Sequence, residues 1–206
     1  GNVAGFSGGY YLIAGILYSI ELYADFSGCM DIILGASKCF GIILPENFKT
    51  PFFSKTVQEY WQRWHISLGV WLKNYVLYPI LKSKLFKSIG KGLNNVFGKK
   101  ASRQIVSNLG SLCVWLIIGL WHGFGPAYIF GMGLWFWACI TIEQYFDPLK
   151  KLPLLQIIRT FILVCIGNIF FSSGSVSKTF EIIRLSFKKS VFDFSLLGIG
   201  SKDAII

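Results

Sequence analysis

Residues Val57 to Ile80 read V-Q-E-Y-W-Q-R-W-H-I-S-L-G-V-W-L-K-N-Y-V-L-Y-P-I and are the most distinctive stretch of the chain. They include three of the seven tryptophans and one of the two histidines. The apolar residues recur at helical spacing, which predicts one continuous helix with a wide apolar surface. Glu59 and Arg63 are four residues apart, so we expect an ion pair on the remaining face. Such a helix suits an interface or a protein-lined cavity.

The composition of the 206 residues is typical of a membrane protein. Apolar residues make up 53% and charged residues 15%, against roughly 25% charged residues in soluble proteins. The mean hydropathy of +0.56 is too high for the apolar side chains to fit in one globular core. We therefore expect an all-α, polytopic membrane protein in which residues 1–206 form a single membrane-embedded region.

The net charge of +10 comes largely from one segment between apolar runs. This segment, residues 82–103, has no acidic residue and carries Lys82, Lys84, Lys87, Lys91, Lys99, Lys100 and Arg103. Positive charge between spans marks the cytoplasmic side of a membrane protein, so we expect a basic cytoplasmic loop here. The same placement argues against nucleic-acid binding.

Apolar runs elsewhere predict several further helices. The first expected segment is 9–23, and a second run extends from Asp31 to Leu44 after a break at Asp25–Gly28. We expect membrane spans at 105–121, 127–146 and 154–171. An amphipathic helix at the membrane interface is expected at 176–190. Lys150 and Lys151 form a second basic segment, which we also expect on the cytoplasmic side. The turn between the two spans that precede them, which contains His122, is therefore expected toward the opposite side.

The two histidines are the main candidates for proton chemistry. His122 follows a spanning run and precedes a glycine-rich turn, so it could lie in a cavity and remove a proton from a hydroxyl group. The alternative is a histidine that only bonds to carbonyls of its own turn. His65 is either a second base or a residue that orients its aromatic neighbours. The two histidines are not spaced as metal ligands. The sequence contains no G-x-S-x-G motif, so a serine hydrolase is not expected.

Three carboxylates, Glu21, Asp25 and Asp31, lie in or beside membrane-depth sequence. Charged groups there are costly and commonly face a cavity, so Asp25 and Asp31 are candidates for its lining. An alternative function follows from them, because a transporter or channel component could use all three along a solute path.

Four motifs occur in one order: Y-A-D-F-S-G-C-M-D (Tyr23–Asp31), L-P-E-N-F (Leu44–Phe48), E-Y-W-Q-R-W-H-I-S-L (Glu59–Leu68) and G-L-W-H-G (Gly119–Gly123). Together they resemble the membrane-bound O-acyltransferase family, in particular its bacterial branch in alginate O-acetylation and lipoteichoic-acid D-alanylation. The resemblance implies a helical bundle around a tunnel, with the catalytic histidine at His122 and the second motif histidine at His65. The remaining tunnel-lining candidates are Trp61, Arg63, Trp64, Trp71 and Trp121.

The resemblance also implies a reaction. An acyl group, expected to be acetyl, passes from a cytoplasmic thioester, acetyl-CoA or an acyl carrier protein, to a hydroxyl of a cell-surface polysaccharide or relay protein. Neither a permanent cofactor nor a metal is expected. The expected partners are the bilayer, a polysaccharide or teichoic-acid-like acceptor and a secreted or membrane-anchored SGNH-type acetyltransferase. The expected location is the bacterial plasma membrane. A scaffold subunit that only docks the secreted acyltransferase is the other alternative.

The chain departs from the family pattern in three places. Lys73-Asn74 replaces Arg-Asp, Cys29 replaces an aromatic residue, and G-N-I-F-F-S (Gly167–Ser172) replaces G-W-x-F-F-R. These departures leave both histidines in place and bear on which acceptor is bound. The family's early helices are also missing. We therefore expect a fragment that lacks N-terminal helices and the C-terminal end of a longer protein.

Overall fold

A computed structural model of the chain describes residues 8–187, and every regular element in that range is helical. The α-helices are α1 (Gly8–Cys39), α2 (Val57–Arg63), α3 (Ile66–Leu72), α4 (Tyr78–Lys82), α5 (Lys84–His122), α6 (Phe136–Tyr145), α7 (Pro153–Ser173) and α8 (Val176–Ser186). A 3-10 turn, η2 (Pro51–Phe53), and two π-helical segments, η3 (Lys73–Leu77) and η4 (Tyr128–Trp135), complete the order. The all-α prediction is confirmed.

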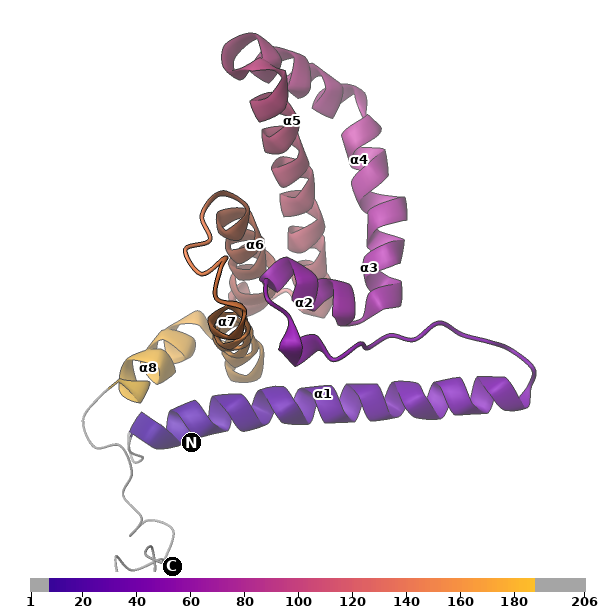
Figure 1. The fold of residues 1–206 in the computed structure, drawn as a ribbon, viewed down its shortest axis with the longest axis vertical. Coiled ribbons are helices and arrows are strands. Elements are labelled where there is room, and N and C mark those ends of the chain that lie inside the picture. The colour runs from indigo at the N-terminus through magenta and orange to yellow at the C-terminus, as the bar shows by residue number, and fades with distance from the viewer. Residues whose placement is uncertain (1–7, 188–206) are drawn as a thin grey trace, which may run out of the picture.

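The helices form a long hairpin that stands on a smaller bundle (Figure 1). The run from α3 to α4 makes one side of the hairpin and α5 the other. Next to the C-terminal half of α5, η4 and α7 pack together, and α1 crosses this end of the bundle in contact with α7 and α8. The elements that contain the two histidines therefore meet where the hairpin joins the bundle.

Three helices of the described part are long and apolar enough to cross a membrane: α1, α5 and α7. The predicted spans at 105–121 and 154–171 are confirmed as helices within α5 and α7. Helix α5 is broken at Gly98, where φ is 79°. At 1.5 Å per residue, the segment 99–122 is about 36 Å long, enough for a hydrocarbon core of about 30 Å. The predicted crossing at 127–146 consists of η4 and α6, and its place in the membrane stays a prediction.

The predicted break at Asp25–Gly28 is wrong, because α1 continues through it to Cys39. The Asp25 side chain is exposed on the helix surface, where it does not disturb the backbone, and one interior glycine costs only about 1 kcal/mol. The helix ends before Leu44. Gly41 (φ 74°) donates to the Lys38 carbonyl, and the next N–H donates to the Ser37 carbonyl, the pattern of a Schellman cap.

The prediction of one helix over Val57–Ile80 is also wrong. Thr56 caps the first segment, α2, since its hydroxyl accepts a 3.0 Å hydrogen bond from the Glu59 N–H. The chain then leaves the helical conformation at Trp64 and His65 before α3 begins. The expected ion pair between Glu59 and Arg63 is confirmed, with 2.6 Å between Oε1 and Nη2.

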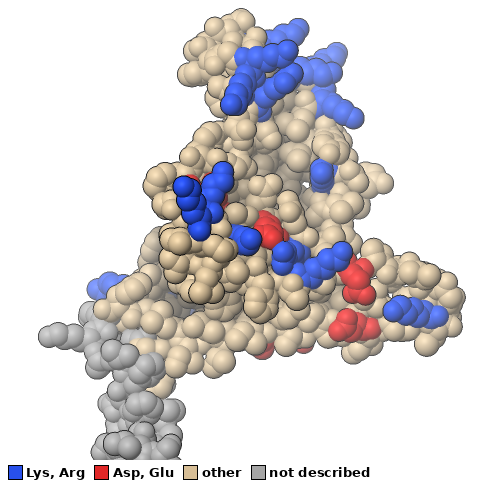
Figure 2. Space-filling model, viewed as in Figure 1, with Lys and Arg blue, Asp and Glu red and all other residues tan. Residues whose placement is uncertain are grey.

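The basic segment 82–103 is helical rather than a loop, apart from Ser83 between α4 and α5 and the break at Gly98. Ser83 caps α5 by accepting a 3.3 Å hydrogen bond from the Phe86 N–H, and lysine is a good helix former. Figure 2 shows Lys and Arg side chains gathered at the tip of the hairpin, away from α1. The cytoplasmic position of this tip remains a prediction.

The predicted helix at 176–190 is confirmed as α8 from Val176 to Ser186. Ser175 caps it by accepting a 3.5 Å hydrogen bond from the Lys178 N–H. Residues 188–190 lie outside the described part of the chain. The interfacial position of the helix stays a prediction, as does the single membrane-embedded unit over 1–206.

Two glycines let α7 approach the segment that follows α5. A Cβ atom on Gly131 of η4 would lie 2.2 Å from the Phe170 Cβ of α7. Conversely, a Cβ atom on Gly167 of α7 would lie 2.3 Å from the ring of Phe136, which is completely buried. Thus η4 supplies a glycine beside Phe170 of α7, and α7 supplies one beside Phe136 at the start of α6, which fixes the spacing of these helices.

An ion cluster ties α6 and α7 to the start of α2. Arg159 of α7 pairs with Glu143 at 2.8 Å and with Asp147 after α6, and it donates a 3.0 Å hydrogen bond to the Lys55 carbonyl. The second oxygen of Glu143 accepts the Val57 N–H at 2.8 Å. Burial raises the pKa of Asp147, but hydrogen bonds from Arg159 and Gln156 outweigh it, so the net pKa is lowered.

Gly131→Ala should destabilise the full-length protein by about 1–3 kcal/mol, because the new methyl group overlaps the Phe170 side chain. The measurement is the midpoint of unfolding of the purified protein in detergent. Gly28→Ala is the matched control, since nothing lies within 4 Å of the added Cβ. Equal midpoints for the two variants would contradict the close packing of η4 on α7.

Candidate functional site

The helix break between α2 and α3 is held by the segment 47–49. The Lys49 N–H donates to the Arg63 carbonyl at 2.9 Å, and the Ile66 N–H donates to the Asn47 carbonyl at 3.1 Å. Phe48 and Trp64 form an isolated antiparallel bridge between these bonds. Backbone groups that would continue a helix thus bond to a distant segment. The prolines that flank this segment, Pro45 and Pro51, suit such an extended connector.

Asn47 orients the first histidine. The Asn47 Oδ1 atom lies 3.3 Å from His65 Nδ1 and accepts two further hydrogen bonds, from the Ser67 N–H at 3.1 Å and its hydroxyl at 2.7 Å. His65 has left-handed backbone angles (φ 48°, ψ 52°). Its ring is nearly perpendicular to the Phe26 ring, with 4.9 Å between the ring centroids. Burial lowers the pKa of His65, which favours the neutral imidazole. In that form Nδ1 donates to Asn47 and Nε2 remains an acceptor.

The second histidine is the last residue of α5. The Gly123 N–H caps the helix by bonding to the Gly119 carbonyl at 3.2 Å. The His122 ring is perpendicular to the Phe171 ring of α7, with 5.5 Å between the ring centroids. Neither ring nitrogen hydrogen-bonds to another residue within 8–187, so this part of the structure does not show the alternative of a histidine bonded to its own turn.

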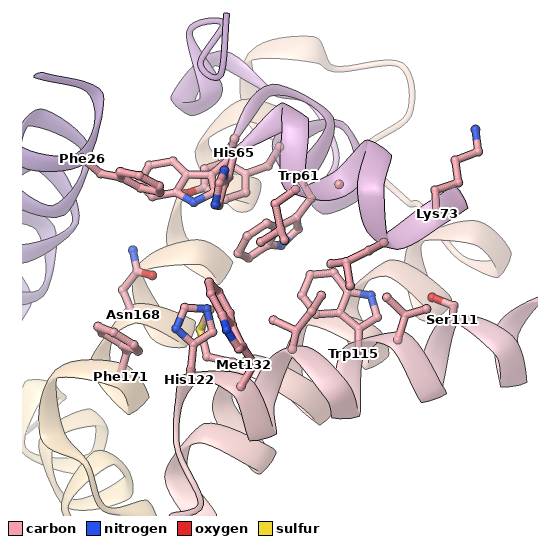
Figure 3. Close-up of a pocket in the computed structure, with 18 of the residues that line it drawn as sticks. Phe26, Trp61, His65, Lys73, Ser111, Trp115, His122, Met132, Asn168 and Phe171 are labelled. Carbon is pink, nitrogen blue, oxygen red and sulfur yellow. The ribbon is translucent and has the colours of Figure 1, made fainter. Parts of the chain in front are cut away.

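Both histidines line one cavity of about 410 Å³ (Figure 3). Most of its wall is apolar and aromatic, and its residues come from α1, α2, α3, η3, α5, η4 and α7 and from the break between α2 and α3. The apolar part of the wall includes Leu22, Phe26, Trp61, Leu68, Leu72, Val114, Trp115, Ile118, Met132 and Phe171. The few polar side chains are His65, Lys73, Ser111, His122 and Asn168, together with the aromatic N–H and O–H groups.

The polar side chains mark two ends of the cavity. Lys73 and Ser111 lie toward the hairpin, and the Lys73 side chain points outward at the rim (Figure 3). His122, Phe171 and Asn168 lie together at the other end. The eleven positions from Ser111 to His122 in α5 correspond to about 16 Å. An elongated substrate could thus enter beside a cation and reach an imidazole in apolar surroundings.

The structure brings five of the predicted site residues to this cavity: His65, His122, Trp61, Trp64 and Trp121. The other four do not line it. Arg63 is held by Glu59 and points toward Thr50, and Trp71 packs on Tyr75 at 5.5 Å on an exposed face.

Asp25 and Asp31 are both exposed on α1. The residues of α1 that line the cavity are Leu22 and Phe26, four positions apart on one face. On the helix, Asp25 is rotated by about 100° from Phe26 and by about 60° from Leu22, to one side of the face that they share. The prediction that these carboxylates line the cavity is therefore not supported by their positions.

Two asparagines were missed in the sequence. Asn47 lies in L-P-E-N-F, one of the four family motifs, and this motif was the signal that could have indicated it. Asn168 lies in G-N-I-F-F-S, where a departure from the family pattern marked the position. No cluster of three or more His, Cys, Asp or Glu side chains that could hold a metal occurs within 8–187.

This arrangement can support proton transfer. An imidazole with an available nitrogen can act as a general base, and surrounding apolar side chains keep water from competing for a reactive substrate. Because His65 and His122 come from different elements, a reacting group between them could be contacted from two sides.

Comparison with known proteins identifies the chemistry of similar chains. Residues 6–93 match the sequence model of the membrane-bound O-acyltransferase family (MBOAT). The chain is 34% identical over 165 residues to the teichoic acid D-alanyltransferase of Bacillus subtilis, covering 75% of this chain and 39% of that protein. It is 31% identical over 189 residues to the probable alginate O-acetylase AlgI of Pseudomonas aeruginosa, covering 90% of this chain and 33% of that protein.

A third relative is the peptidoglycan O-acetyltransferase of Helicobacter pylori, 28% identical over 173 residues. That alignment covers 81% of this chain and 29% of the relative. The chain thus spans well under half the length of each of these curated relatives.

Asn47→Leu should destabilise the full-length protein by about 1–3 kcal/mol, because it removes the acceptor that His65 and Ser67 share. Unfolding of the purified protein in detergent measures the change. Glu46→Leu, at the exposed neighbouring position, is the control and should leave the midpoint near that of the wild type. A midpoint for Asn47→Leu as high as that of the control would show that Asn47 does not hold the helix break.

Proposed function

This chain belongs to the membrane-bound O-acyltransferase family, and we propose that the full-length protein transfers an acyl group between the two sides of a bacterial plasma membrane. The donor is a cytoplasmic thioester, acetyl-CoA or an acyl carrier protein, and the expected group is acetyl. The acceptor is a hydroxyl of a cell-surface polysaccharide, a teichoic-acid-like polymer or a relay protein. The names of the relatives support this kind of acceptor.

One observation carries the proposal: the only two histidines of the chain line the same apolar cavity. His122 takes the role of general base. The acceptor oxygen forms a bond to the thioester carbonyl carbon while its proton moves to His122. The carbon–sulfur bond then breaks, and the leaving thiolate takes up that proton. His65 has an auxiliary role beside the reacting groups.

The remaining wall residues bind and shield the donor. Lys73 at the rim suits an anionic part of the donor, such as a phosphate. Trp61, Trp64 and Trp115 form an apolar lining that excludes water, which favours acyl transfer over hydrolysis. Lys73 belongs to the α3–α4 side of the hairpin, which leads to the basic tip (Figure 2), and this arrangement supports donor entry from the cytoplasm.

A secreted or membrane-anchored SGNH-type acetyltransferase is the proposed partner on the opposite side, where it would pass the acyl group on. The scaffold alternative assigns all chemistry to that partner. The transporter alternative needs Glu21, Asp25 and Asp31 along a solute path, but their exposed positions on α1 lie outside the cavity.

His122→Ala in the full-length protein should lower acyl transfer by about 10²–10⁴-fold, the usual contribution of a general base. Membranes from cells that express the protein are incubated with labelled acetyl-CoA, and label in the envelope polymer is measured. Gln62→Ala, at an exposed position of α2, is the control for insertion and expression. Undiminished labelling in His122→Ala would overturn the mechanism and favour the scaffold role.

Ser111→Phe should lower transfer roughly tenfold or more without altering either histidine, because the ring would occupy the route between Lys73 and His122. The same labelling assay, run over a range of acetyl-CoA concentrations, measures the change. Ser107→Phe is the matched control, since Ser107 is exposed one turn earlier in α5. Wild-type transfer by Ser111→Phe would show that the donor does not pass this point.

A further inference from the structure

Asn168 is a buried polar residue in the wall of the cavity that the proposed chemistry does not use. It belongs to α7, and only 6% of it is exposed. Its neighbours in the wall are mainly apolar, and an amide buried there is costly unless its polar atoms are bonded. The placement of an amide here therefore calls for partners for both its nitrogen and its oxygen.

The nitrogen of this amide has a partner in α1. The Asn168 Nδ2 atom donates a hydrogen bond to the Ser19 hydroxyl oxygen at 3.1 Å, and Ser19 donates its own proton to the Gly15 carbonyl at 2.9 Å. Because the single hydroxyl proton of Ser19 is already used, its oxygen can only accept from Asn168. These two hydrogen bonds orient the Asn168 amide with its nitrogen toward Ser19 and its oxygen away from Ser19.

The oxygen of the amide is directed into the cavity. Figure 3 shows it on the side of Asn168 that faces His122. Within residues 8–187 no hydrogen bond to Asn168 Oδ1 occurs. One helical turn later, the Phe171 ring lies nearly perpendicular to the His122 ring, with 5.5 Å between their centroids. Helix α7 thus presents Asn168 and the aromatic neighbour of His122 on the same face. A hydrogen-bond acceptor and a proton-accepting imidazole thus share this end of the cavity.

We propose that Asn168 is a specificity-determining residue for the acceptor, and that its Oδ1 atom accepts a hydrogen bond from a second hydroxyl beside the reacting one. The reacting hydroxyl has one proton, which goes to His122, so it cannot also serve Asn168. A second O–H group on the same molecule, as in a sugar or another polyol, satisfies the amide oxygen. An acceptor without it leaves that oxygen without a partner, which a buried site disfavours.

This inference rests on the proposed acyl transfer, and the experiment separates the two. Membranes with the full-length protein receive labelled acetyl-CoA, and two rates are measured: label transferred to the envelope polymer, and thioester hydrolysis without added acceptor. Asn168→Leu should lower polymer labelling on the order of tenfold or more and leave hydrolysis unchanged. Ser172→Ala, on the exposed side of α7, is the control.

Each outcome has a defined meaning. If the wild type labels no acceptor, the proposed function fails and this inference fails with it. If the wild type labels the polymer and Asn168→Leu labels it equally well, only this inference fails. Equal losses of labelling and hydrolysis would assign Asn168 to folding or to the donor, and would also overturn it.

Two further measurements keep the test decisive. Ser19→Ala leaves Asn168 in place but frees its amide to rotate, so it should cause a smaller loss in polymer labelling than Asn168→Leu, again without a change in hydrolysis. Small alcohols test the polyol assignment: the wild type should label 1,2-propanediol at least tenfold faster than 1-propanol, and Asn168→Leu should lose this preference. Equal rates with the two alcohols in the wild type, including no labelling of either, would overturn the polyol assignment.

Discussion

The site depends on a set of backbone hydrogen bonds that stop one helix and start the next. Because the segment 47–49 pairs with 63–66, the aromatic stretch turns at Trp64 and His65 instead of continuing straight. A non-glycine residue in the left-handed region costs of order 1–3 kcal/mol, and such strain concentrates at functional sites. Here the cost falls on His65, whose ring is thereby placed in the cavity wall beside Phe26.

The rest of the bundle keeps the other wall in position. Gly131 and Gly167 set the distance between η4 and α7, while Arg159 holds α7 to α6 and to the start of α2. Polar groups are thus concentrated at a few joints between helices, and the intervening surfaces are apolar. The result is a cavity whose few polar atoms come from several elements, each anchored separately.

The sequence allowed part of this to be predicted, and the limit has a physical origin. The helices at 105–121, 154–171 and 176–186 follow from apolar runs and periodicity, which are local properties. The resemblance directed attention to His122 and His65, which do share a cavity. The break at His65 could not be predicted because it depends on backbone hydrogen bonds that join Arg63 and Ile66 to residues 14 and 19 positions earlier. The prediction that Asp25 lines the cavity failed for a related reason. Whether a carboxylate faces a cavity depends on how its helix is rotated about its own axis, and one residue in a sequence does not give that rotation.

The two π-helical segments make the cavity wall depend on local helix geometry. Both η3 and η4 contribute to its wall, through Lys73 and Leu77 on one side and Met132 on the other. A π turn accommodates an additional residue relative to an α turn, and each residue rotates the following side chains by about 100° in an α-helix. If the eight residues of η4 wound as an α-helix without a change in their number, the side chains that follow would be rotated and Phe136 would turn away from Gly167. The π winding of η4 therefore contributes, together with the side chains themselves, to placing Phe136 against α7.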